Sequence, residues 1–180
     1  GAVSRKRQSS SVSTIDMPDV KKRLLRYYSL TEEEYEAMAK PATFDDIPLL
    51  PETPDLVRAK TRIELGVKKH DRILIYGDYD ADGIMSASII KICLRQIGSE
   101  AQVFIPSRYL DGYGLTMENA VRIANCFDLV ILVDNGVSSS TEIRYLKEKG
   151  VDVIVLDHHE IGECPPLDAF AFVHPDRLKY

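Results

Sequence analysis

Residues 72–98 read RILIYGDYDADGIMSASIIKICLRQIG, and this segment sets the architecture that we expect for the chain. It begins with an apolar run of strand length at 72–77, passes through an acidic loop, and continues as a mostly apolar helical pattern at 83–98. A glycine closes the pattern, as is common at the C-terminal end of a helix. The segment therefore predicts a buried strand followed by a helix, the first half of a parallel βαβ unit.

The rest of the chain repeats this alternation. Helical patterns occur at 116–125 and from Ser139 to Gly150, where Ser139 and Glu142 have the spacing of a capping box. Strands that are apolar throughout and alternate with helices are typical of a parallel sheet buried on both faces. We therefore predict an α/β fold, a doubly wound, mostly parallel five-stranded sheet with helices on both faces. Its further strands are expected at residues 101–106, 129–133, 151–156 and 170–173.

The N-terminal part of the chain is organised differently. Residues 1–14 are rich in Ser, Arg and Lys and have no apolar periodicity, which predicts a disordered tail. Residues 15–70 are expected to form a helical lead-in, with a capping box that begins at Thr31 and an apolar helical face at 55–69. Residues 71–180 then form the α/β domain.

The composition is that of an ordinary globular protein, 44% hydrophobic and 28% charged over 180 residues, with a net charge of −5. This acidic balance argues against a protein that coats nucleic acid through bulk positive charge, but it leaves a nucleic-acid enzyme open. No apolar run approaches the ~18 residues of a membrane span. Three cysteines argue against a disulfide scaffold and for a reducing compartment. Cys93 is expected in the core because it lies on the apolar side of its helix.

Acidic and histidine side chains follow three of the predicted strands. DYDADG (78–83) comes after the first strand, DNG (134–136) after the third, and DHHE (157–160) after the fourth. Ligands of open α/β sheets bind beyond the carboxyl ends of the strands, so we expect these side chains at one edge. Converging carboxylates repel one another unless cations neutralise them. Oxygen ligands with one or two imidazoles favour Mn²⁺ or Mg²⁺, with Zn²⁺ as a further option.

Asp134 stands alone between the two other clusters, which makes it the candidate for a bridging ligand. Two metal ions ~3.5–4 Å apart are the usual device for attack of water on a phosphodiester. The alternative is that each aspartate merely caps the helix that follows it. That alternative is a good account of any one aspartate and a poor account of the whole set. His174, by contrast, stands alone and is not expected to be a ligand.

Four motifs, in order, are similar to those of the DHH phosphoesterase superfamily, whose name describes the triplet at 157–159. Within it they resemble the RecJ-type single-strand-specific 5′→3′ exonucleases, and the resemblance covers roughly residues 45–176. The motifs are ILIYGDYDADG (73–83), IPSRYLDGYGL (105–115), VDNGVSS (133–139) and VLDHHE (155–160).

The resemblance implies a role for each motif residue. Asp80 resembles a ligand of the first of two metal ions, Mn²⁺ or Mg²⁺, and Asp134 resembles the carboxylate that bridges the two. Asp82 and His158 resemble ligands of the second ion. His159 is similar to the histidine that contacts the scissile phosphate and stabilises the transition state.

Three more positions matter to this resemblance. Asp78 is similar to a residue that assists the site, and Arg108 to an arginine that holds a phosphate of the substrate strand. Tyr76 departs from the pattern, because many superfamily members have a histidine there. The first metal ion is therefore expected to be held weakly.

The resemblance also implies a biological setting. The substrate is single-stranded DNA, the process is DNA repair and recombination in the cytoplasm, and the partners are a single-stranded-DNA-binding protein or a helicase, with no membrane involved. The family's catalytic domain continues to a further aspartate ligand and a second, substrate-binding domain. The chain is therefore expected to be an N-terminal fragment that, in isolation, binds metal weakly and has little nuclease activity.

Two alternatives remain open. The first is a DHH enzyme that acts on short oligonucleotides or cyclic dinucleotides, although the segment DGYGL (111–115) favours the RecJ type. The second is an inactive DHH module that scaffolds replication or repair proteins. The motif aspartates argue against it, because an inactive module has no need of mutually repelling carboxylates.

Overall fold

The computed structural model describes residues 17–41, 43, 45, 51–107, 112 and 114–177. These residues belong to two compact units that divide between Leu49 and Leu50. The first unit contains helices α1 (Met17–Tyr28) and α2 (Glu32–Ala39). The tail predicted at residues 1–14 lies outside the described residues.

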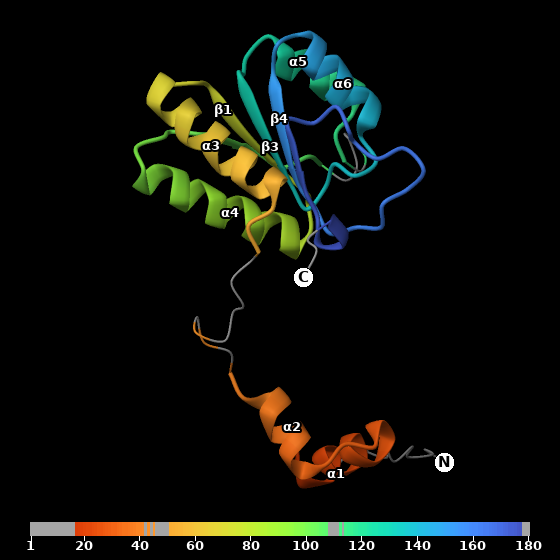
Figure 1. Ribbon diagram of the computed structural model, residues 1–180. Helices are drawn as coiled ribbons and strands as arrows, with labels where there is room; N and C mark the ends of the chain where they lie inside the picture. The colour runs from red at the N-terminus through yellow and green to blue at the C-terminus, as the bar shows by residue number, and fades with distance from the viewer. Residues whose placement is uncertain are drawn as a thin grey trace, which may run out of the picture. The chain divides into compact units, whose positions relative to one another are not determined.

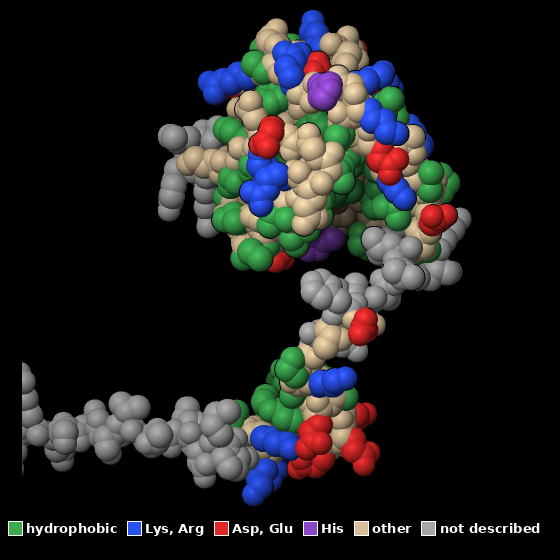
Figure 2. Space-filling view, turned by 90° about the vertical axis from the view of Figure 1, so that its left-hand side faces the viewer, with side chains coloured by type: hydrophobic (Ala, Val, Ile, Leu, Met, Phe, Trp, Pro, Cys, Tyr) green, Lys and Arg blue, Asp and Glu red, His purple; other side chains and the backbone are tan. Residues whose placement is uncertain are grey.

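The two helices of the first unit are joined by a tight turn. The predicted capping box is confirmed: Thr31 Oγ1 accepts a hydrogen bond from the backbone N–H of Glu34 (3.1 Å), and the Glu34 carboxylate accepts one from the backbone N–H of Thr31 (2.7 Å). Lys21 of α1 forms ion pairs with Glu32 and Glu36 of α2. Acidic side chains gather on one side of this unit (Figure 2). Among the described residues, no helix combines the length and apolarity needed to cross a lipid bilayer.

The second unit is a parallel sheet with helices on both faces. Its strands lie in the order β2-β1-β3-β4-β5, and every neighbouring pair is parallel. Helices α3 and α4 cover one face, and α5 and α6 cover the other (Figure 1). The predicted doubly wound sheet is confirmed. The elements are α3 (Pro54–Lys69), β1 (Ile73–Gly77), α4 (Ala81–Gln96), β2 (Gln102–Phe104), α5 (Met117–Ala124), β3 (Leu129–Val133), α6 (Ser140–Glu148), β4 (Asp152–Leu156), β5 (Ala171–Val173) and the 3₁₀ helix η2 (Pro175–Arg177).

The core consists of two apolar layers, one on each face of the sheet. In the central strand β3, Val130 and Leu132 pack in the layer under α5 and α6, whereas Leu129, Ile131 and Val133 pack in the layer under α3 and α4. Both faces are covered, so the strand is apolar at every position. β3 pairs over its full length with β1 and β4, which places the carboxyl ends of these three strands side by side.

Several local predictions are wrong. β2 is a short edge strand whose residues are all exposed, so it is not buried on both faces. Cys93 is exposed rather than in the core. The reason is that α4 faces the sheet through Ala87 and Leu94, and one residue turns the helix by ~100°. Other apolar side chains of α4, Met85 and Ile89 among them, are also exposed.

One capping bond and one boundary also differ from prediction. Ser139 makes no side-chain capping bond to α6, because its ψ of 36° is far from the extended conformation of capping residues. The unit boundary lies at 49/50 rather than at 70/71. The reason is that α3 packs on the sheet, with Ala59 buried in the core layer and Ile63 and Val67 against it.

Candidate metal centre

The turn after β1 carries two acidic residues of the site. Asp78 is buried, and its Oδ1 accepts a hydrogen bond from the backbone N–H of Tyr79 (2.7 Å). Asp80 is exposed and caps α4, because its Oδ1 accepts from the backbone N–H of Gly83 (3.0 Å). A Cβ on residue 83 would lie 2.5 Å from the backbone N and O of Asp78, so only glycine fits there. The close approach of α4 to the end of β1 therefore sets the positions of both carboxylates.

Asp134 follows the central strand β3 and has a left-handed backbone, with φ of 60°. The residue is only 5% exposed, and its Oδ1 lies 3.0 Å from Nε2 of His158. Within the described part of the chain, its Oδ2 has no hydrogen-bond partner. Asn135 stabilises this turn, because its Nδ2 donates hydrogen bonds to the backbone oxygens of Tyr76 (3.2 Å) and Val133 (2.9 Å). A buried carboxylate oxygen without a partner is costly, so Asp134 is suited to a ligand from outside the chain.

The turn after β4 holds the DHH triplet, and Asp157 organises it. Asp157 is buried, and its carboxylate accepts hydrogen bonds from the ring Nδ1 of His159 (2.7 Å) and from three backbone N–H groups, those of Val137, His158 and His159. Burial alone would raise the pKa of Asp157, but these hydrogen bonds outweigh it and hold that pKa below its ordinary value. The hydrogen bond with Asp157 also raises the pKa of His159. Asp157 is therefore an anion that orients His159.

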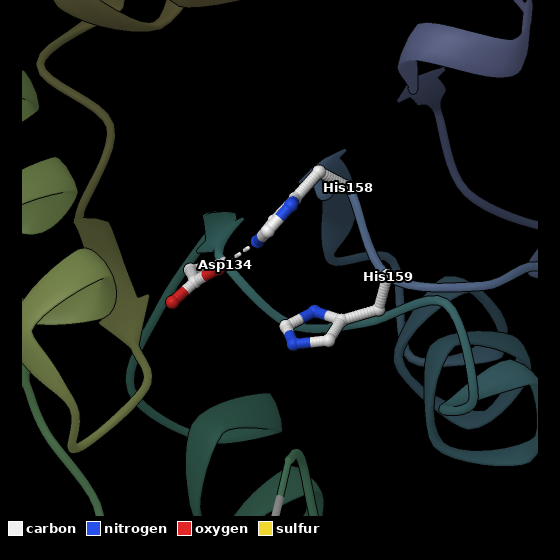
Figure 3. A group of neighbouring side chains, drawn as sticks. All are labelled: Asp134, His158 and His159. Carbon is white, nitrogen blue, oxygen red and sulfur yellow. Dashed lines mark hydrogen bonds and ion pairs between the residues drawn. The ribbon is translucent and has the colours of Figure 1, made fainter. Parts of the chain in front are cut away.

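The three turns converge at the carboxyl edge of the sheet. One potential ligand atom from each of Asp134, His158 and His159 lies within 4.8 Å of the others, and the same holds for Asp78, Asp80 and Asp134. Figure 3 shows Asp134 at the end of β3, with His158 and His159 approaching from the turn after β4. Asp134 belongs to both groups, which is the arrangement that a bridging carboxylate requires.

The electrostatics of this edge favour a cation. Burial, followed by the charge of Asp80, raises the pKa of Asp134. The N–H of Gly83 has the opposite effect on Asp80 and lowers its pKa. Two adjacent carboxylates are stable together only with a shared proton or a cation. The 3.0 Å between Nε2 of His158 and Oδ1 of Asp134 matches adjacent ligands of an octahedral ion with bonds of ~2.1 Å. Oxygen and imidazole donors fit Mn²⁺ or Mg²⁺.

Two of the residues considered from the sequence, Asp82 and Tyr76, lie apart from this cluster, and the position of a third is not described. Asp82 is exposed in the first turn of α4 and belongs to neither group of potential ligands. Arg108 lies outside the described residues. Tyr76 is buried in the core, where its hydroxyl donates to the backbone oxygen of Gly114 (3.0 Å) and accepts from Nδ2 of Asn119 (3.1 Å). These bonds engage the hydroxyl in the core layer, so Tyr76 does not replace a histidine ligand.

Sequence reasoning missed His174. The structure buries it at the end of β5, with Nε2 at 2.7 Å from the backbone oxygen of His159. Its position directly after an apolar strand was the only signal in the sequence. A lone histidine gives no spacing from which a partner 15 residues away could be inferred.

Comparison with known proteins bears on this site. Residues 72–179 match the family model described as DHH family, N-terminal domain, which covers more than half of the chain. That matched segment contains every element of the sheet and all of the strand-end residues described above.

Individual relatives are similar over the same region. The chain is 40% identical over 126 residues to the single-stranded-DNA-specific exonuclease RecJ of Bacillus subtilis, covering 69% of this chain and 16% of that protein. It is 40% identical over 111 residues to RecJ of Thermus thermophilus, covering 62% of this chain and 17% of that protein. A crystal structure of exonuclease RecJ bound to manganese matches with a TM-score of 0.67 and 37% identity, covering 73% of this chain and 33% of that chain. The chain thus spans less than a fifth of the length of these two curated relatives.

Proposed function

The chain belongs to the DHH family, and we propose that it forms the metal-binding part of an exonuclease that hydrolyses single-stranded DNA. The observation that carries the proposal is the cluster around Asp134, whose buried Oδ2 has no partner among the described residues. The substrate class is supported by the relatives, which are named single-stranded-DNA-specific exonucleases. Manganese or magnesium as cofactor is supported by the donor set and by the manganese named for a similar structure.

Each acidic residue has a place in this proposal. Asp80 and Asp134 would hold one ion, and Asp134 with His158 would hold the other. Asp82 lies apart from both groups of potential ligands in this structure and would have to turn toward the second ion to complete its ligands. When bound, the ions supply Lewis-acid activation of water and neutralise charge on the phosphate. Asp78 is buried and has a carboxylate oxygen within 4.8 Å of ligand atoms of Asp80 and Asp134, where it would assist these ligands.

His159 would act on the phosphate. Its Nδ1 donates to Asp157, so Nε2 is the nitrogen with which the ring reaches a phosphate oxygen. The raised pKa of His159 favours its imidazolium form, a charged donor that stabilises negative charge developing on the phosphate. Arg108 is proposed as a second phosphate contact, since a guanidinium binds phosphate oxygens in pairs.

The polarity of DNA digestion and the cellular role belong to the same proposal. We further propose digestion from the 5′ end, a role in DNA repair and recombination, a cytoplasmic location, and a single-stranded-DNA-binding protein or helicase as partner. These proposals rest on the resemblance of the four motifs to the RecJ type, whereas the names of the relatives give the single-strand specificity alone.

The proposal is tested in the full-length protein with Asp134→Asn, which keeps the volume of the side chain and removes its charge. We expect Mn²⁺-dependent hydrolysis of 5′-labelled single-stranded DNA to fall by at least about 100-fold. Isothermal titration of the metal-stripped protein with Mn²⁺ should show a parallel loss of affinity. Duplex DNA, single-stranded RNA and a cyclic dinucleotide serve as competing substrates in the same assay.

The matched control is Glu100→Gln, which removes one exposed carboxylate just before β2, at the opposite edge of the sheet. This variant should behave as wild type. Unchanged hydrolysis by Asp134→Asn would refute the metal-dependent mechanism, and preference for the cyclic dinucleotide would assign the site to a small-substrate enzyme. A wild-type protein without activity on any of the four substrates would favour the scaffold.

A further inference from the structure

His174 is the one buried histidine among the described residues, and it lies next to the candidate metal centre. The residue is 2% exposed and follows β5 directly. It lines a hollow of about 410 Å³ whose wall also contains Asp134, Asp157 and His158. A histidine is an expensive residue to bury unless both ring nitrogens are hydrogen-bonded, so its partners indicate what it does.

Both ring nitrogens of His174 have defined partners. The backbone N–H of Asp176 donates to Nδ1 (3.2 Å), so Nδ1 carries a lone pair. Nε2 therefore carries the proton, and it donates to the backbone oxygen of His159 at 2.7 Å. The carboxylate of Asp176 is 3.9 Å from Nδ1, and its side chain is 77% exposed, so water screens it. The geometry thus selects one tautomer, in which Nε2 is the donor and Nδ1 the acceptor.

The bond from His174 completes a three-point attachment of His159. Asp157 accepts from the ring Nδ1 of His159 (2.7 Å) and from its backbone N–H (3.2 Å). His174 holds the third point, the backbone oxygen, and it does so from the next strand of the sheet. A residue fixed at its ring, its N–H and its carbonyl cannot rotate about its backbone without breaking one of these bonds.

We propose that His174 is a positioning residue that aims His159 at the scissile phosphate. The inference rests on the proposed function, since it assumes that His159 contacts substrate. Among the described residues, the hydrogen bond that joins His174 to the candidate metal centre is the one to the backbone oxygen of His159. Loss of its Nε2–H donor should therefore slow the chemical step while leaving metal binding intact, because a reacting group displaced by ~1 Å can lose about 100-fold in rate.

Packing alone does not account for a histidine here. The Phe172 ring lies 5.6 Å from the His174 ring, and the hollow is lined by Leu156 and Val173, so an apolar side chain would suit the surroundings. An apolar side chain would, however, leave the carbonyl of His159 and the N–H of Asp176 without partners. The two nitrogens serve different partners, which allows the two contacts to be separated by mutation.

The test compares His174→Gln with His174→Asn in the full-length protein. The Gln amide nitrogen reaches about as far as Nε2 and retains the donor to His159, whereas the Asn oxygen takes the place of Nδ1 and retains only the acceptor for Asp176. We expect Gln to stay within about threefold of the wild-type kcat and Asn to lose about 10- to 100-fold, with KM for single-stranded DNA and Kd for Mn²⁺ unchanged in both.

Thermal unfolding of the variants separates positioning from stability. The proposal is overturned if Asn and Gln have equal kcat, or if kcat falls only in step with Tm or with Mn²⁺ affinity. His174→Ala, which removes the donor without adding an amide, decides the question if Asn does not fold, and a wild-type kcat in Ala then overturns it. An inactive wild-type protein would instead refute the proposed function, so the two failures are distinguishable.

Discussion

Asp80 shows that one carboxylate can cap a helix and also take a place in the candidate metal centre. Its Oδ1 accepts from the N–H of Gly83, as a capping residue does, and the same side chain offers a ligand atom within 4.8 Å of Asp78 and Asp134. The cap lowers the pKa of Asp80 and so keeps it charged for a cation. The two interpretations of strand-end aspartates are therefore not exclusive, because the cap would preorganise Asp80 as a ligand.

Gly83 offers a sharp test of that preorganisation. Gly83→Ala would place a Cβ 2.5 Å from the backbone of Asp78, where no flexible side chain can give way. The turn between β1 and α4 must then open, which we expect to destabilise the fold by about 1–3 kcal/mol and to weaken Mn²⁺ binding at least tenfold. Urea denaturation and metal titration measure the two effects. Gly162→Ala, where a Cβ meets nothing within 4 Å, should change neither, and an unaffected Gly83→Ala would show that the turn tolerates movement.

Individual residues were predictable to the extent that their spacing carries information. Asp78, Asp80, Asp134 and the two histidines follow strands, and the parallel sheet brings them together as expected. The sequence pattern groups Asp82 with them because it follows the same strand. The cap at Asp80, however, places Asp82 in the first turn of α4, apart from both groups of potential ligands. That separation depends on where the helix begins, which apolar periodicity does not define.

Strands and helices were predictable where every residue is buried, and less predictable at the border of the sheet. β1 and β3 are buried at every position, so their apolar runs carry a clear signal. The exposed edge strand β2 and the outward face of α4 carry similar apolar residues without the burial. Apolar composition alone therefore does not separate the interior of the sheet from its border.

One ion pair joins the residues that directly precede two central strands, β1 and β3. It should make the free energy of unfolding depend on pH. Arg72, just before β1, donates to Asp128, just before β3, through its side chain and its backbone N–H, and these bonds lower the pKa of Asp128 to about 2. The stabilisation is present above the ordinary pKa of 3.8 and is lost as pH falls toward 2. Because the Asp128 side chain is 40% exposed, we expect at most about 1 kcal/mol.

Asp128→Asn measures this contribution. Urea denaturation at pH 7, 4 and 3 should show a deficit for the variant at pH 7 that shrinks at each lower pH. Glu163→Gln, an exposed carboxylate between β4 and β5, is the control and should show no such trend. A deficit that stays constant down to pH 3 would mean that Asp128 acts through packing rather than through its charge.

At the scale of the whole molecule, the helix α3 decides which part of the chain folds together. The sequence assigned α3 to a lead-in because it precedes the first strand, yet it packs on the far end of the sheet, against β5. Arg62 of α3 also pairs with Asp71 and with Asp152 of β4. Contacts between segments this far apart leave no local pattern, so the unit boundary was the feature least accessible to sequence reasoning.

Two truncated chains test this boundary. Residues 50–180 should unfold cooperatively, whereas 71–180 lacks α3 and exposes the core layer beneath Ala59, Ile63 and Val67. Loss of the apolar contacts that Ile63 and Val67 make with this layer costs about 3 kcal/mol in free energy of unfolding. Loss of Arg62 also leaves Asp152 and Asp71 without this ion-pair partner. We expect 71–180 to lose at least that much in urea denaturation, or to aggregate. Equal stability of the two chains would show that α3 is an accessory to the sheet and would restore the boundary at residue 70.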